Sequence, residues 1–245
     1  MENYDPMDSF RQDTADTYDD HLRGDEAATV AFLSALASDG PALELAIGTG
    51  RIALPLAAAG VRVDGVDLSE AMVAKLRTRP GGEDLTVVMG DFADVPVDGS
   101  YRLIYLVYNT LFNLLTQDEQ IRCFENVAGH LDDDGVFVVE AFVPSYLHRL
   151  RDNQYVDAEH LAVGAVTLDV GQHDPVAQIL NESHVVLSAA GTQVVPIVTR
   201  YAWPSELDLM ARIAGLRLRE RWAGWNREPF TGSSRNCVSV YERRP

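Results

Sequence analysis

The chain has 245 residues, 47% of them hydrophobic, and its 37 acidic and 20 basic residues give a net charge of −17. This charge repels polyanions, so we expect no nucleic acid and no membrane surface among its partners. No apolar run approaches the roughly 18 residues that span a bilayer, and the acidic N-terminus is unlike a signal peptide. We expect a cytoplasmic protein with one large domain.

Residue types that carry covalent or metal chemistry are scarce. Cys123 and Cys237 are too few for a disulfide framework and lie in no metal-binding spacing. The six histidines are scattered, so we expect no metal site. Lys75 is the only lysine, which makes Schiff-base chemistry an unattractive hypothesis.

The N-terminal 40 residues are predicted to form a helical lid. Residues 1–13 are polar and are expected to be poorly ordered or to cover a site. Helices are predicted over residues 16–23 and 25–38, and the second ends at Asp39-Gly40-Pro41.

Strand-like and helical segments alternate over residues 41–145. Strands are predicted at 42–46, 61–66, 85–89, 101–108 and 135–141, and helices at 52–59, 70–77 and 118–130. Such alternation indicates a Rossmann-like α/β fold, with a parallel sheet and helices on both faces. Ligands of such sheets bind beyond the carboxyl ends of the strands.

The pattern changes after Pro144. Residues 146–202 contain β-rich runs at 161–170, 177–188 and 192–201, which predict a small antiparallel insertion after the fifth strand. Residues 203–245 are predicted to add a helix with Ser205 as its N-cap, and two strands that complete the main sheet.

The most informative stretch runs from Ala42 to Arg51, where a buried strand leads into a glycine-rich turn and a helix. Gly48 and Gly50 let the backbone turn tightly and let a ligand approach bare amide groups. The N-terminus of the following helix points its N–H groups at the same place.

Three successive strands carry acids near their carboxyl ends, namely Glu44, Asp67 and Asp91. This arrangement predicts one edge of a nucleotide site. The spacing Gly48-x-Gly50-x-x-Ala53 also fits a dinucleotide fingerprint, with Asp67 as the ribose acid. However, about 40 residues precede the first strand, and Glu44 would repel a pyrophosphate. A cationic ligand without phosphate, such as S-adenosylmethionine, avoids that conflict.

Over about residues 15–145 the chain resembles the class I S-adenosylmethionine-dependent methyltransferases. The family's first motif corresponds to Glu44-x-Ala46-x-Gly48-x-Gly50, with Ala46 in place of a glycine. The other matching segments are Val66-Asp67-Leu68-Ser69 followed by Met72, Gly90-Asp91-Phe92, residues 105–113 as the substrate-facing turn, and Thr17-Tyr18-Asp19-Asp20 as the segment that closes over the cofactor.

The resemblance implies roles for these residues. Glu44 would balance the sulfonium and ammonium groups, Asp67 would accept both ribose hydroxyls, and Asp91 would accept the adenine amine. The implied cofactor-binding set is Tyr18, Glu44, Ala46, Gly48, Gly50, Asp67, Leu68, Met72, Asp91, Phe92 and Tyr108.

Methyl transfer from a sulfonium is an in-line displacement that requires an aligned nucleophile. A general base is needed only when that nucleophile carries a proton, and the candidates are Glu140 and His21. The residues expected to line the acceptor site are Asn109, Phe112, Asn113, Arg200 and Trp225.

We therefore expect an S-adenosylmethionine-dependent methyltransferase (EC 2.1.1) that methylates N, O or C of a small molecule, in keeping with secondary metabolism. The antiparallel insertion resembles that of amino-sugar N-methyltransferases, where such a layer roofs the substrate and often mediates a homodimer. Two alternatives stay open: an NAD(P)- or nucleotide-sugar-binding Rossmann enzyme, and a catalytically silent domain that only binds S-adenosylmethionine.

Overall fold

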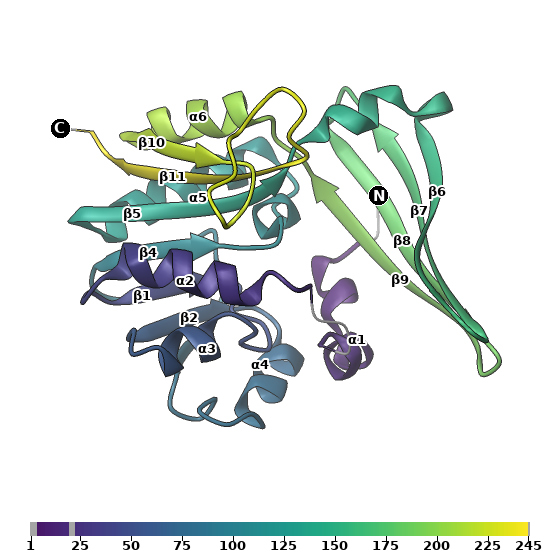
Figure 1. The fold of residues 1–245 in the computed structure, drawn as a ribbon, viewed down its shortest axis with the longest axis horizontal. Coiled ribbons are helices and arrows are strands. Elements are labelled where there is room, and N and C mark those ends of the chain that lie inside the picture. The colour runs from purple at the N-terminus through teal and green to yellow at the C-terminus, as the bar shows by residue number, and fades with distance from the viewer. Residues whose placement is uncertain (1–3, 20–22, 245) are drawn as a thin grey trace.

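The computed structural model describes residues 4–19 and 23–244. They form a seven-stranded sheet with helices on both faces and a separate four-stranded sheet that arches away from it (Figure 1). The Rossmann-like α/β fold and the antiparallel insertion after the fifth strand are thus confirmed. Within the described residues, no helix is long and apolar enough to cross a membrane.

The large sheet has the strand order β10-β11-β5-β4-β1-β2-β3. Strands β1 to β5 run parallel to one another, and β11 pairs antiparallel with both β5 and β10. The strands are β1 (Ala42–Leu45), β2 (Val63–Asp67), β3 (Thr86–Met89), β4 (Tyr101–Leu106), β5 (Leu131–Phe142), β10 (Leu216–Trp222) and β11 (Asn236–Arg243). The carboxyl ends of β1 to β5 therefore meet at one edge.

Six α-helices lie within the described residues: α1 (Gln12–Thr17), α2 (Glu26–Ala37), α3 (Ala53–Ala58), α4 (Glu70–Arg77), α5 (Gln117–His130) and α6 (Pro204–Ile213). Alternate residues of a strand point to opposite faces. In β1, Leu43 and Leu45 accordingly pack in the same core as residues of α5 and α6. Ala42 packs in the second core with residues of α2 and α3, which lie in front of the sheet in Figure 1.

The insertion consists of β6 (Gln154–Ala162), β7 (Ala165–Asp174), β8 (Ile179–Ser188) and β9 (Gly191–Arg200), paired in chain order. One of its faces is apolar and exposed, because Val156 pairs with Val170 and Val185 pairs with Val194 on the same side. Val156 and Val194 are 63% and 57% exposed. The opposite face carries polar and charged side chains.

Three predictions about elements were wrong in detail. The first helix lies at Gln12–Thr17 instead of 16–23, because a short 3-10 helix, η1 (Pro6–Phe10), begins the segment earlier with Asp5 as its cap. The run predicted as one strand over 161–170 instead includes a hairpin turn at Gly164, whose φ is +85°. Helix α6 begins at Pro204, so Ser205 lies inside it and is not the N-cap.

Candidate active site

A cavity of about 300 Å³ lies at the carboxyl edge of β1, β2 and β3. Residues from η1, from the end of α1 and from the turn after β4 complete its wall. The residues predicted from sequence that line it are Tyr18, Ala46, Gly48, Asp67, Leu68, Met72, Asp91, Phe92 and Asn113. The structure therefore brings together most of the predicted cofactor set.

Asp67 fixes the glycine-rich turn to the end of β2. Its Oδ2 accepts the Gly48 N–H at 2.6 Å and its Oδ1 accepts the Ser69 N–H at 2.8 Å. Burial raises the pKa of the Asp67 carboxyl, and these two backbone hydrogen bonds partly oppose the increase. Ala46 and Gly48 both have left-handed φ values, 55° and 56°. The carboxylate is thus held at the cavity wall with a fixed orientation.

Gly50 does not line the cavity. Its φ is +76°, and a Cβ there would lie 2.3 Å from a methyl carbon of Leu76 in α4. The glycine is therefore required for the approach of the turn to α4, which is a packing role.

Glu44 also lies away from the cavity wall. It is 2% exposed, and the Tyr105 hydroxyl donates to its Oε2 at 3.0 Å. Burial raises the pKa of Glu44 to about 8, although Tyr105 and Arg51 favour its charged form. Its predicted balance of a sulfonium charge stays a prediction, because the contacts in this structure are with Tyr105 beneath the turn.

Asp91 and Phe92 follow β3 and line the cavity. Asp91 Oδ1 accepts the Ala93 N–H at 2.8 Å, and its Oδ2 pairs with Arg122 of α5 at 3.1 Å. The Asp91 carboxylate is therefore oriented by its own turn and by an arginine.

The N-terminal segment closes over the cavity. The Ser9 hydroxyl donates to the Pro196 carbonyl of β9 at 2.6 Å, and the Ser69 hydroxyl donates to the Phe10 carbonyl at 2.8 Å. Asp19 pairs with Arg79 at 2.6 Å. Tyr18 belongs to this segment, at the end of α1, and burial raises the pKa of its phenol to about 12. The segment expected to be poorly ordered or a lid is thus tied to β9 of the insertion and to residues at both ends of α4.

Glu140 lies near the end of β5, beside the turn after β4. Its Oε2 accepts the Tyr108 N–H at 2.6 Å, and its Oε1 accepts the indole N–H of Trp225 at 3.2 Å. Asn109 Oδ1 accepts the Phe142 N–H at 2.6 Å. Tyr108 and Asn109 are not in the cavity wall, whereas Asn113 is. His21, the other predicted base, lies outside the described residues.

Three predicted acceptor residues are placed elsewhere. Phe112 is fully buried in the core, against Phe142. Arg200 is buried, donates to Gln120 Oε1 at 2.7 Å and pairs with Glu206 at 2.7 Å. Trp225 is buried against Phe32 of α2. Sequence pattern alone does not separate such core networks from a roof over the acceptor.

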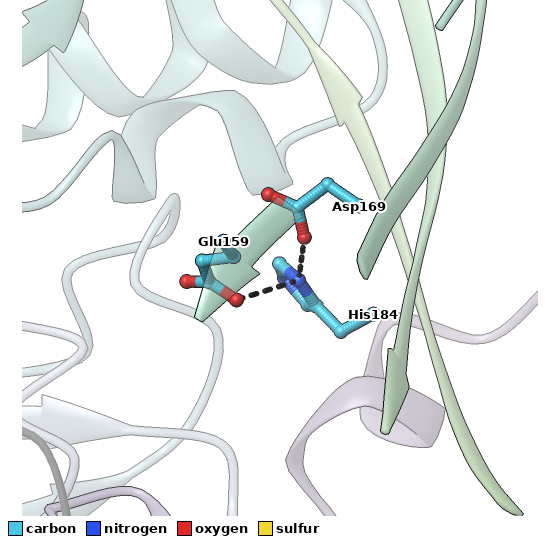
Figure 2. Close-up of side chains that lie close together, drawn as sticks. All are labelled: Glu159, Asp169 and His184. Atoms are coloured by element: carbon cyan, nitrogen blue, oxygen red, sulfur yellow. Dashed lines mark hydrogen bonds and ion pairs between the residues drawn. The ribbon is translucent and has the colours of Figure 1, made fainter. Parts of the chain in front are cut away.

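A carboxylate–imidazole cluster lies on the polar face of the insertion. Figure 2 shows Glu159, Asp169 and His184 projecting toward one another from neighbouring strands. Nδ1 of His184 lies 2.5 Å from Asp169 Oδ1 and 3.6 Å from Glu159 Oε2, and its Nε2 lies 3.7 Å from Glu182 Oε1. The Tyr155 hydroxyl donates to Glu182.

The cluster acts through its charge on Tyr108, in the turn after β4. The charges of Glu159 and Asp169 contribute to a raised pKa of the Tyr108 phenol, although burial is the larger cause. Sequence reasoning missed the cluster, whose candidate ligand atoms lie within 4.8 Å of one another. The expectation of no metal site stays a prediction. Only the strand register, in which Asp169 pairs with His184, brings these residues together.

Comparisons with known proteins agree with this geometry. A family model described as "Methyltransferase domain" matches residues 42–135. The structure of the CcbJ methyltransferase from Streptomyces caelestis is 40% identical, with a TM-score of 0.92, over 99% of this chain and 100% of that one. The cypemycin N-terminal methyltransferase of a Streptomyces species is 29% identical over 82% of each chain. The sugar N-methyltransferase KedS8 of a Streptoalloteichus species shares the fold, with 18% identity and a TM-score of 0.68 over 94% and 92%.

Proposed function

We propose that this protein, which belongs to the class I S-adenosylmethionine-dependent methyltransferases, methylates a basic nitrogen of its small-molecule acceptor. The enzyme class (EC 2.1.1) and the cofactor follow from the family. S-adenosylmethionine supplies the methyl group and leaves as S-adenosylhomocysteine. The observation that carries the choice of nitrogen is the excess of carboxylates on the polar face of the insertion.

The cavity residues fit the cofactor's chemistry. Each oxygen of Asp67 accepts one backbone N–H and keeps a further lone pair for a ribose hydroxyl. Leu68, Met72 and Phe92 supply apolar surface for a flat base. The left-handed turn at Ala46 and Gly48 brings the main chain close to the ligand. We assign the cofactor to this cavity.

The polar face of the insertion fits a cationic acceptor. Glu159, Asp169 and Glu182 surround His184, so an ammonium ion is attracted and an anion is repelled. The exposed ring of Tyr146 adds a surface for cation–π contact. Several relatives carry N-methyltransferase names, which supports the same acceptor atom.

A protonated amine must lose a proton before it has a lone pair to donate. His184 is the residue we assign to this step, because the hydrogen bond to Asp169 orients its ring on the face that carries the carboxylates. The proton moves from the acceptor nitrogen to the imidazole. The freed lone pair then forms the new N–C bond as the S–CH3 bond breaks, and the electron pair of that bond stays on the sulfur of S-adenosylhomocysteine.

A matched acceptor panel tests this proposal. Amino sugars, amino acid esters and peptides with free N-termini would be assayed with tritiated S-adenosylmethionine, each beside its hydroxyl analogue. We expect label only in amines, and the variant Glu159→Gln should raise KM for the amine about tenfold while the Kd for S-adenosylhomocysteine is unchanged. Equal labelling of the alcohols, or an unchanged KM, would contradict the nitrogen assignment and leave the cofactor assignment intact.

For the apolar outer face of the insertion we propose a second copy of the chain. Val156, Val170, Leu187 and Val194 lie on this face and are exposed, and such patches mark interaction sites. Two copies related by a twofold axis can cover the same patch on each other. Sedimentation should show a dimer that Val170→Asp dissociates, and a wild-type monomer at 100 μM would contradict the proposal.

We also propose that the enzyme acts in the cytoplasm, where its two buried free cysteines stay reduced.

A further inference from the structure

The chain leaves β4 through a turn in which two successive residues other than glycine adopt the left-handed backbone conformation. Tyr108 has a φ of 57° and Asn109 a φ of 61°. This region is unfavourable for residues with a Cβ, so it persists only where neighbouring groups hold the chain in place. The groups that hold this turn therefore decide where its side chains stand.

Strand β5 supplies both anchors of the turn. The carboxylate of Glu140 accepts the Tyr108 N–H at 2.6 Å, and the side-chain oxygen of Asn109 accepts the Phe142 N–H at 2.6 Å. Because β5 is paired with β4 and β11 in the sheet, these bonds fix the turn to a rigid element.

The carboxylate of Glu140 is itself held in place. The Trp225 indole donates to its second oxygen at 3.2 Å, and the guanidinium of Arg23 lies 3.8 Å from the first. The Trp225 ring packs edge-on against Phe32, with centroids 5.5 Å apart. With both oxygens engaged and the side chain 9% exposed, Glu140 is placed as an anchor.

The turn joins the two halves of the site. Tyr108 is 42% exposed and stacks against Arg23, whose guanidinium carbon lies 3.7 Å from the ring centroid. The residues that follow, Thr110–Asn113, pack against β9 of the insertion. A few residues later, Thr110 and Asn113 line the cofactor cavity. A shift of the turn would therefore move the acceptor wall relative to the cofactor wall.

We propose that Glu140 is a positioning residue for methyl transfer. It acts through the Tyr108 amide, holding the turn that aligns the acceptor with the methyl donor, and it does not accept the acceptor's proton. In-line transfer depends steeply on alignment, and a displacement of about 1 Å can cost on the order of 100-fold in rate. The inference rests on the proposed acceptor side of the site.

The test compares Glu140→Gln with Glu140→Ala, using the most active amine of the panel and tritiated S-adenosylmethionine. Glutamine retains an oxygen that can accept the Tyr108 N–H, whereas alanine retains no acceptor. We expect kcat to fall by less than about tenfold in the glutamine variant and by about 100-fold in the alanine variant. The pH profile of kcat/KM should keep the wild-type shape in both.

Two results would overturn the inference. In one, Glu140→Gln loses as much kcat as Glu140→Ala and the acidic limb of the pH profile disappears, which identifies a base. In the other, Glu140→Ala keeps wild-type kcat. Thermal unfolding shows whether the alanine variant folds, and if it does not, the glutamine variant and its pH profile still decide. The amine-against-alcohol comparison on the wild-type enzyme reports separately on the proposed acceptor class.

Discussion

The imidazole of His184 and the carboxylate of Asp169 face each other across a register pair of β7 and β8, with Nδ1 and Oδ1 2.5 Å apart. A carboxylate in this position selects one ring orientation of the imidazole. The pair therefore has the arrangement of a proton acceptor with its orienting group. It is carried entirely by the insertion and not by the large sheet.

Asp169→Asn should lower kcat/KM for an amine acceptor by about 10- to 100-fold, because the amide no longer fixes the orientation of the His184 ring and carries no negative charge toward the acceptor. The Kd for S-adenosylhomocysteine should not change. Asp157→Asn is the matched control, since Asp157 is exposed and pairs with Asp169 across the strands. An equal loss of kcat/KM in both variants would mean that the polar face of the insertion acts on the acceptor only through its overall negative charge.

Asp67→Ala should weaken the binding of S-adenosylhomocysteine by at least about 100-fold, because two charge-assisted hydrogen bonds to the ribose are lost, each contributing roughly 1.5–3 kcal/mol. Isothermal titration measures the affinity, with NAD titrated in parallel. Asp64→Ala, on the same strand, is the control and should bind as the wild type does. Unchanged affinity of the Asp67 variant would refute its assignment to the ribose, and binding of NAD alone would favour the dinucleotide alternative.

The sequence was sufficient to predict the α/β sheet and most of the cavity wall. Both depend on local signals: alternating strands and helices, a glycine-rich turn, and acids at strand ends. Asp67 could be predicted because the end of a parallel strand fixes its place. The paired set of Asp169 and His184 could not, because those residues are brought together only by the register of two antiparallel strands.

The local sequence pattern also did not show which polar side chains are buried in the core and which line the site. Glu44 matches the acid of the family motif, but successive side chains of a strand point to opposite faces of the sheet. The Glu44 side chain lies on the face beneath the glycine-rich turn, where it contacts Tyr105. Arg200 was expected at the acceptor site and instead closes a buried network with Gln120 and Glu206. In both cases the partner is distant in the sequence, so only the packing of separate elements reveals it.

The buried carboxyl of Glu44 should make stability depend on pH. Its pKa is about 8 in the folded protein against 4.5 for the ordinary group, so between these values the folded state binds more protons than the unfolded state. Stability from this group is present in full below pH 4.5 and is lost as the pH rises to about 8.

Glu44→Gln should therefore gain stability relative to the wild type as the pH rises, because its amide stays neutral. Since one pKa unit corresponds to about 1.4 kcal/mol, we expect the difference in the free energy of unfolding to increase by at least about 1 kcal/mol between pH 5 and pH 8. Urea unfolding measures it. The exposed Glu83→Gln is the control, and parallel pH dependences for the wild type and Glu44→Gln would contradict this account.

Ala46 stands in the left-handed region, with a φ of 55°, where the family motif has glycine. This conformation costs a residue with a Cβ about 1–2 kcal/mol, whereas glycine adopts it freely but loses about 0.5–1 kcal/mol more backbone entropy on folding. The two effects oppose each other and the first is larger. We expect Ala46→Gly to raise the free energy of unfolding by about 0.5 kcal/mol.

The matched control is Ala59→Gly, because Ala59 is the C-cap of α3, has a φ of −79° and gains nothing from the freedom of glycine. That variant should lose about 0.5 kcal/mol or more in the same denaturant titration. The affinity for S-adenosylhomocysteine should be retained in Ala46→Gly, since the substitution removes only one methyl group. Destabilisation of both variants to the same extent would show that the turn at Ala46 stores no strain.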